Sequence, residues 1–171
     1  MKKARLKITL ACNKKCTYCI NKSEEYNIKW KRISSLNQVN WDKYRSIIIS
    51  GGEPTIFKDL IPILDSLRSV TKSPIYLQTN GFGLTKKLVR AVDDYIDGIG
   101  LSIHDIGEFK HYYTRYLDIL KIKPIRLYVE KEMFDHNQPA IGYAALHKDF
   151  SFRVWSEGEF DSEEDIYLLI D

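Results

Sequence analysis

Short β-rich runs alternate with longer amphipathic segments along most of this sequence, and this alternation restricts the fold more than any other feature. The runs cover residues 5–10, 46–50, 75–79, 98–103, 125–129 and 150–155, and each is rich in Ile, Leu, Val or aromatic residues. Such alternation is typical of a parallel sheet with right-handed crossovers. A closed eight-stranded barrel needs ~250 residues. The 171 residues here therefore predict an α/β fold, an incomplete (β/α)6 TIM-like partial barrel with parallel strands.

The segments between these runs show helical periodicity. Thr85 is expected to cap a helix over residues 85–96, and Pro62 is tolerable in the first turn of a helix over residues 57–70. The apolar stripe of that helix is Leu60, Ile61, Leu64 and Leu67. In residues 108–121 we expect a core-facing stripe of Phe109, Tyr112, Tyr113, Tyr116, Leu117 and Leu120. A short helix is expected at 141–146, and residues 22–44 show no clear pattern.

Length and hydropathy predict one domain without a membrane segment. A chain of this size buries one core, so we expect a single domain over residues 1–171, with the partial barrel at 5–155 and an acidic tail at 156–171. No apolar run approaches the ~20 residues that span a bilayer. Arg5 and Lys7 interrupt the N-terminal apolar stretch, whereas a secretory signal needs ~7–15 apolar residues. We therefore expect a cytoplasmic protein.

Basic residues are concentrated at the N-terminal end. Residues 1–32 contain ten Lys or Arg and two acidic residues. This block is either a solvated face or a docking surface for an anion, such as a nucleotide, an RNA or an acidic electron-transfer protein.

All three cysteines lie within twelve residues, in the segment "ACNKKCTYCINK" that follows the first predicted strand. Cys12, Cys16 and Cys19 form a C-x3-C-x2-C pattern, which in a reducing compartment indicates metal ligands rather than disulfides. A structural zinc ion would need a fourth ligand, and the available imidazoles are His104, His111, His136 and His147. A [4Fe–4S] cluster would instead keep one iron open to a small molecule, and we favour this alternative.

The cysteine pattern, with Tyr18 before the last cysteine, resembles the signature of the radical S-adenosylmethionine (SAM) enzymes. "SGGEPT" after the second predicted strand and Thr79-Asn80-Gly81 after the third also resemble segments of that superfamily. This chain would be an unusually short member. The resemblance implies that Cys12, Cys16 and Cys19 bind a [4Fe–4S] cluster whose fourth iron anchors SAM.

The resemblance also implies which residues bind SAM. Tyr18 would lie near the adenine, Glu53 and its neighbouring backbone would receive the methionine amino group, and Ser102 would contact the ribose or carboxylate. Gly51 and Gly52 would let the backbone approach the ligand closely, since they lack a Cβ atom. Asn80 would belong to the same site, although Asn-Gly is also an ordinary turn sequence.

Other polar residues follow the later predicted strands. His104 and Asp105 come after the fourth strand, and His104 either touches substrate or lies on the surface. The ends of the fifth and sixth strands carry Glu130, Lys131, Ser156 and Glu157. Arg126 and Arg153 lie inside strands, so the register decides whether they face water, an acid or an anionic substrate.

Three functions remain open from the sequence. We favour an enzyme that cleaves SAM reductively to a 5′-deoxyadenosyl radical and abstracts hydrogen from a small anionic or nucleotide-derived substrate, similar to the 7-carboxy-7-deazaguanine synthases. It would need an external one-electron donor such as flavodoxin or ferredoxin. One alternative is an activase-like enzyme that installs a radical on a partner protein, and the other is a non-enzymatic zinc-stabilised binding module.

The acidic tail ends in an apolar run, residues 167–170. Because an exposed apolar end is a liability, we expect these residues to dock as a strand or short helix on the barrel edge or across a homodimer.

Overall fold

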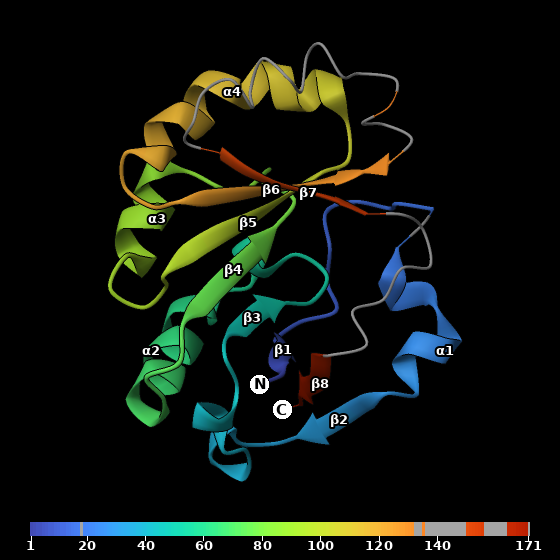
Figure 1. Ribbon diagram of the computed structural model, residues 1–171, viewed down its shortest axis with the longest axis vertical. Helices are drawn as coiled ribbons and strands as arrows, with labels where there is room; N and C mark the ends of the chain where they lie inside the picture. The colour runs from blue at the N-terminus through green and yellow to red at the C-terminus, as the bar shows by residue number, and fades with distance from the viewer. Residues whose placement is uncertain (18, 132–134, 136–149, 156–163, 171) are drawn as a thin grey trace.

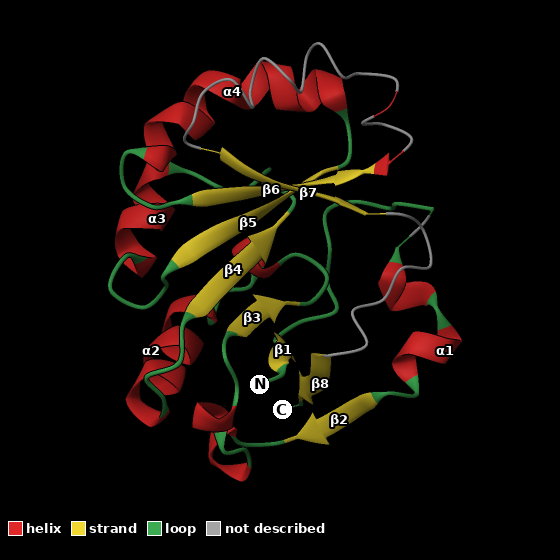
Figure 2. Ribbon diagram, viewed as in Figure 1, coloured by secondary structure: helices red, strands yellow, loops and turns green. Residues whose placement is uncertain are grey.

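A computed structural model describes residues 1–17, 19–131, 135, 150–155 and 164–170 of the chain. Its strands form one curved sheet in which every pairing is parallel (Figures 1 and 2). The order across the sheet is β2-β8-β1-β3-β4-β5-β6-β7. The strands are β1 (Lys3–Lys7), β2 (Trp30–Ile33), β3 (Ile47–Ser50), β4 (Ile75–Thr79), β5 (Gly98–Ile103), β6 (Ile125–Glu130), β7 (Phe150–Trp155) and β8 (Glu164–Leu169).

The predicted partial barrel is confirmed, with two additional strands. Each of the six predicted runs overlaps one strand, and β2 and β8 extend the sheet beyond β1. The two outer strands, β2 and β7, do not pair with each other among the described residues, so the barrel stays open. Strand β2 lies in the polar stretch 22–44, where the sequence pattern gave no prediction.

The helices lie on both sides of this sheet. Helices α2, α3 and α4 cover the convex side, whereas α1 lies on the open, concave side together with the loop that follows β1 (Figure 1). The α-helices are α1 (Glu24–Asn27), α2 (Leu60–Val70), α3 (Lys86–Val92) and α4 (Ile106–Leu120). Short 3-10 helices are η1 (Ile20–Lys22), η2 (Leu36–Gln38), η3 (Trp41–Lys43) and η4 (Pro54–Ile56).

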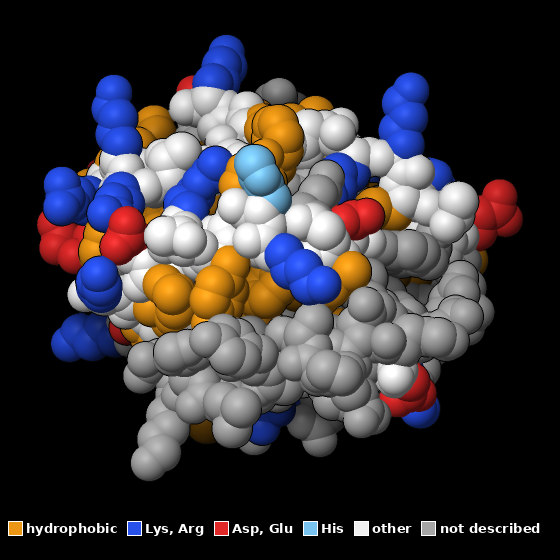
Figure 3. All heavy atoms as spheres, turned by 90° about the horizontal axis from the view of Figure 1, so that it is seen from above, with side chains coloured by type: hydrophobic (Ala, Val, Ile, Leu, Met, Phe, Trp, Pro, Cys, Tyr) orange, Lys and Arg blue, Asp and Glu red, His pale blue; other side chains and the backbone are white. Residues whose placement is uncertain are grey.

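Most helix details follow the sequence expectations. The Thr85 side chain accepts a hydrogen bond from the Leu88 backbone N–H and caps α3. Phe109 and Tyr116 of α4 are buried, which confirms that the aromatic stripe belongs to the core. The outer face over α4 carries scattered Lys and Arg side chains (Figure 3). In α2 the prediction for Ile61 is wrong, because its side chain is exposed and Ile63 packs against the core instead. The helix expected at 141–146 lies outside the described residues.

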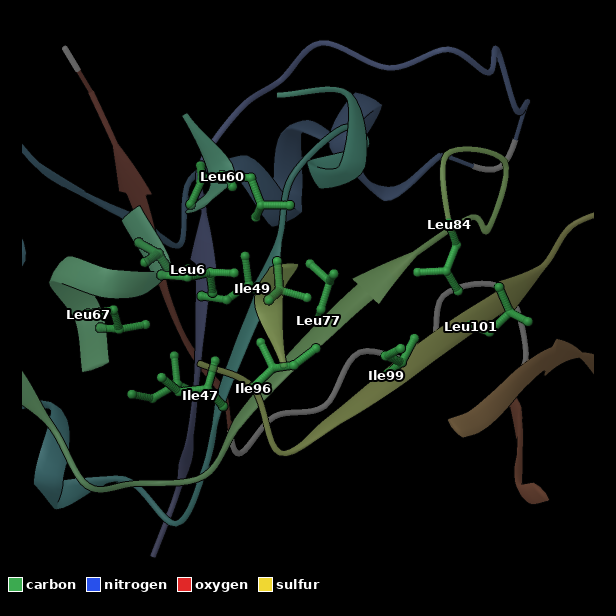
Figure 4. Close-up of a cluster of buried hydrophobic side chains, with 14 of the residues drawn as sticks. Leu6, Ile47, Ile49, Leu60, Leu67, Leu77, Leu84, Ile96, Ile99 and Leu101 are labelled. Carbon is green, nitrogen blue, oxygen red and sulfur yellow. The ribbon is translucent and has the colours of Figure 1, made fainter. Parts of the chain in front are cut away.

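The convex face of the sheet is apolar and forms the core with the helices (Figure 4). Residues in register share a face because side chains alternate along each strand, and Leu6 pairs in this way with Ile49, which pairs with Leu77. The concave face carries polar side chains at the alternate positions, including Arg5, Lys7 and Gln78. The barrel interior is therefore not filled by branched apolar residues, as it is in a closed barrel.

The prediction that the apolar tail docks as a strand is confirmed, since residues 164–169 form strand β8. Its predicted place at the barrel edge is wrong, because β8 lies inside the sheet between β1 and β2. Tyr167 is buried beside Trp41, with ring centroids 5.2 Å apart. Its hydroxyl lies 2.6 Å from the hydroxyl of Tyr44, which donates to Asp165 at 2.7 Å. The tail thus docks within its own chain.

Candidate functional site

A cavity of about 260 Å³ opens on the concave side of the sheet, at the carboxyl ends of the strands. This is the end at which parallel α/β folds build their sites. The structure brings eight of the predicted site residues to its lining: Cys12, Cys16, Cys19, Gly51, Gly52, Glu53, Asn80 and Ser102. Tyr18 lies outside the described residues, so its role stays a prediction.

The cysteine loop runs from the end of β1 to η1 along the rim of this cavity. Cys12 is exposed, whereas Cys16 and Cys19 are half-buried. Burial and the neighbouring Cys19 thiol raise the pKa of Cys16, so metal binding here would release a proton. The Cys16 Sγ atom lies 3.8 Å from Nδ1 of His104. Among the described residues, no three His, Cys, Asp or Glu side chains are grouped to hold a single metal ion.

The two glycines after β3 have a packing role that the sequence did not predict. A Cβ atom at Gly51 would lie 2.1 Å from the carbonyl oxygen of Thr9, and one at Gly52 would lie 2.0 Å from that of Ala11. The Gly52 N–H donates to Thr9 at 2.7 Å, and the Glu53 N–H donates to Ala11 at 2.8 Å. The glycines therefore allow the start of the cysteine loop to pack on the β3 tip. Both also line the cavity, so their close approach to a ligand stays a prediction.

Replacing Gly52 with alanine is expected to displace the cysteine loop. The new methyl group would overlap the Ala11 carbonyl, and overpacking against backbone costs about 3 kcal/mol. Thermal unfolding should show this loss, and iron incorporation after anaerobic reconstitution should fall with it.

The matched control is Gly107→Ala in α4, where the added Cβ atom meets, among the described residues, the Asp105 side chain alone. That variant should melt within a few degrees of the parent chain. A Gly52→Ala chain that melts and binds iron like the parent would contradict the packing role.

Glu53 joins the tips of two strands through its buried carboxylate. The side chain is 1% exposed, and its Oε1 atom accepts from the Thr55 N–H at 3.0 Å and from the Thr55 and Thr79 hydroxyls at 2.6 Å. The Oε2 atom accepts from the Asn80 N–H at 2.7 Å. Since Glu53 also lines the cavity, its binding of a ligand amino group stays a prediction that adds to this structural role.

Replacing Glu53 with glutamine should lower stability. An NH2 group would occupy one oxygen position and face the Asn80 N–H, so that a buried donor would lose its acceptor. Losing a hydrogen bond to a charged group costs about 2–3 kcal/mol, which corresponds to roughly 4–12 °C in a chain of this size. Thermal unfolding by circular dichroism measures the change, with Asp65→Asn on exposed α2 surface as the control. An unchanged melting temperature for Glu53→Gln would argue against the junction.

Asn80 forms a turn and also contacts the cysteine loop. Its Oδ1 atom accepts from the Phe82 N–H at 3.0 Å, while its Nδ2 group donates to Asn13 at 2.8 Å. Gly81 has a φ of +82°, which favours glycine. The Asn-Gly turn is therefore present and is part of the cavity wall as well.

Several cavity residues escaped the sequence analysis because they lie inside strands. Arg5 binds Glu164 with its Nε atom at 2.7 Å and its NH2 group at 3.1 Å, and it donates to Gln78 at 2.7 Å. Gln78 donates in turn to Ser102 at 3.3 Å. Charged and apolar residues alternate in "RLKI". This alternation could have predicted that Arg5 and Lys7 line the cavity, since a strand with one apolar and one charged face lines a polar interior.

Lys7 is the other charged residue of β1 that faces the cavity. Its side chain is 1% exposed and donates to Oδ1 of Asn21. The ammonium lies 4.2 Å from the ring centroid of Trp30 and 5.0 Å from that of Tyr26. Burial, followed by the charge of Arg5, lowers the pKa of Lys7 to about 7.

The register settles the direction of the two arginines in later strands. Arg126 pairs with Gly100, and Arg153 pairs with Tyr128, so both lie on the concave face. Arg153 and His104 line the cavity, whereas Arg126 is exposed. The structure does not describe Ser156, Glu157 or the side chain of Glu130.

Comparisons with known proteins give one family. A family model described as "Radical SAM superfamily" matches residues 6–130. A probable GTP 3′,8-cyclase of Sulfolobus acidocaldarius is 29% identical over 106 residues, and the GTP 3′,8-cyclase of Pasteurella multocida is 30% identical over 113 residues. The matches cover 60% of this chain in both cases, and 34% and 33% of the relatives. The chain thus matches about a third of the length of these relatives.

Solved structures share the fold. SuiB of Streptococcus suis aligns with a TM-score of 0.64 at 19% identity, over 99% of this chain and 42% of that protein. The structure of anSMEcpe with bound AdoMet and a peptide aligns with a TM-score of 0.58 at 17% identity, over 93% of this chain and 54% of that one. Within the described residues, no helix is both long and apolar enough to cross a membrane.

Proposed function

The chain belongs to the radical SAM superfamily, and we propose that its cavity uses a [4Fe–4S] cluster and SAM to abstract hydrogen from a small, nucleotide-derived substrate. The observation that carries this proposal is the convergence of all three cysteines with Gly51, Glu53, Asn80 and Ser102 on one cavity. We also propose that residues 1–171 act as a single core domain.

The residues present fit the cofactors. Three thiols on one loop are the donors that iron–sulfur clusters take, and the adjoining cavity of about 260 Å³ is near the lower limit of ordinary ligand pockets. Cys12, Cys16 and Cys19 would hold the cluster, while Glu53 and Ser102 would hold SAM. With the three cysteines bound to the cluster, no zinc site is needed to explain their pattern.

When bound, the cofactors supply a 5′-deoxyadenosyl radical that takes a hydrogen atom from the substrate. The protein orients the reacting groups and keeps water away from them. The Glu53 junction and the Asn13–Asn80 contact fix the cysteine loop over the strand ends, and Lys14 and Lys22 add positive charge beside the thiols. An external donor such as flavodoxin or ferredoxin would supply the electron.

Charge supports the choice of substrate. The cavity wall carries four basic residues, Arg5, Lys7, Lys14 and Arg153, against two acidic ones, Glu53 and Glu164. This excess of basic groups suits an anionic substrate. Relatives with the name GTP 3′,8-cyclase agree with a nucleotide-derived one.

Anaerobic reconstitution tests the proposal. We expect about four irons per chain, as the cluster composition requires, and release of 5′-deoxyadenosine after addition of SAM and dithionite. A nucleotide substrate such as GTP should stimulate that release. A colourless chain with one zinc ion, or turnover that only a partner protein stimulates, would contradict the proposal.

A further inference from the structure

We infer that Lys7 and Ser50 bind an anionic oxygen group of the substrate, a phosphate or a carboxylate, at the floor of the cavity. This inference rests on the proposed function in that it assigns the bound anion to the substrate of the same site. It concerns two residues of the sheet itself, one on β1 and one on β3.

The register places the two side chains next to each other. Lys7 and Ser50 are direct partners in the β1–β3 pairing, so they point to the same, concave side. Lys7 is 1% exposed and Ser50 is 7% exposed, yet both line the cavity. They are therefore within reach of a bound ligand while being shielded from bulk water.

Both groups retain hydrogen-bonding capacity. The Ser50 hydroxyl is buried and has no hydrogen-bond partner among the described residues. An ammonium has three donors, and Lys7 uses one on the amide oxygen of Asn21. A buried hydroxyl without a partner is uncommon in native proteins, and a ligand oxygen would satisfy it.

The charge of Lys7 is not neutralised by a carboxylate within the described structure. Two acidic residues line this wall. Glu164 is engaged by Arg5 through two hydrogen bonds, and Glu53 accepts hydrogen bonds from Thr55, Thr79 and Asn80. The rings of Trp30 and Tyr26 flank the ammonium and offer cation–π attraction, but they carry no charge. Because burial lowers the pKa of Lys7 to about 7, roughly half of the Lys7 side chains are protonated at neutral pH. A bound anion would favour the protonated form, because the interaction between opposite charges is poorly screened there.

The direct test is isothermal titration calorimetry with inorganic pyrophosphate, malonate and SAM on the reconstituted chain. The parent should bind pyrophosphate or malonate, and the better ligand identifies phosphate or carboxylate recognition. Lys7→Met should weaken that binding at least tenfold and Ser50→Ala about threefold, while SAM binds both variants within twofold of the parent. Lys87→Met, which removes an exposed lysine of α3, is the matched control and should change nothing.

The inference would be overturned if neither anion bound the parent chain, or if both bound Lys7→Met as tightly as the parent. It would also be overturned if Lys7→Met lost as much affinity for SAM as for the anion, because the anionic group would then be the SAM carboxylate. Ser50→Ala removes a hydroxyl without partners and should fold normally. A second test needs no variant: pyrophosphate should protect Lys7 of the parent chain from acetic anhydride, as measured by mass spectrometry. A lack of protection would contradict the site.

None of these measurements needs SAM cleavage, so a chain that binds pyrophosphate through Lys7 but releases no 5′-deoxyadenosine would refute the proposed function alone.

Discussion

A Cys16→Ser chain is expected to retain less than a tenth of the iron of the parent after anaerobic reconstitution, and to release no 5′-deoxyadenosine. Cys16 is the middle cysteine of the loop and lies beside the cavity wall at His104. A serine hydroxyl is a much poorer ligand for iron than a thiolate, because it stays protonated at neutral pH. Iron analysis and the visible absorbance of the cluster measure the effect.

This experiment distinguishes a loss of the cluster from a loss of the fold. Among the described residues, the Cys16 side chain contacts His104 at 3.8 Å, and the loop is held mainly by the backbone of Thr9 and Ala11. The Cys16→Ser chain should therefore melt like the iron-free parent, and Thr17→Ser, an exposed change on the same loop, should bind iron normally. Full iron content in Cys16→Ser would remove this cysteine from the ligand set.

Removal of residues 166–171 is expected to abolish cooperative unfolding. The deletion takes away Ile166, Tyr167 and Leu168, all of which are buried. Each such side chain contributes about 1.5–3 kcal/mol, so the loss approaches the ~5–15 kcal/mol that stabilise an ordinary domain. Strand β2 would also lose its hydrogen-bonding partner in the sheet.

Two single substitutions show which side chains of the deleted segment account for the loss of stability. Tyr167→Ala should cost about 3–5 kcal/mol, as expected for a buried aromatic residue, while Ile170→Ala at a partly exposed position should cost less than about 1 kcal/mol. Urea titration followed by tryptophan fluorescence reports both, and Trp41 packs on Tyr167. A truncated chain with a normal urea midpoint would show that β8 contributes little to stability.

The strands were predictable because the convex face needs apolar residues at a fixed period, and residues 75–79 and 98–103 coincide with β4 and β5 as observed. Strand β2 was not predictable in this way, since only Ile33 of its four residues is buried. The position of β8 beside β1 depends on pairing between residues far apart in the chain, about which local periodicity says nothing.

The chemistry of the site was predictable in part. The cysteine spacing and the motif after β3 indicated a cavity that the structure does form. The role of Gly52 was not foreseeable, because the carbonyl that excludes a side chain there belongs to Ala11, on another segment. The significance of Lys7 likewise depends on Ser50 across the sheet, a neighbour that only the register reveals.

The place of β8 also affects the order of events during synthesis. Strands β1 and β2 leave the ribosome early, but the strand that joins them is made more than a hundred residues later, a delay on the order of ten seconds at bacterial or eukaryotic elongation rates. Throughout that interval the nascent chain has a gap between β1 and β2, and Trp41 awaits Tyr167. The newborn polypeptide must therefore be kept from aggregation until β8 enters the gap.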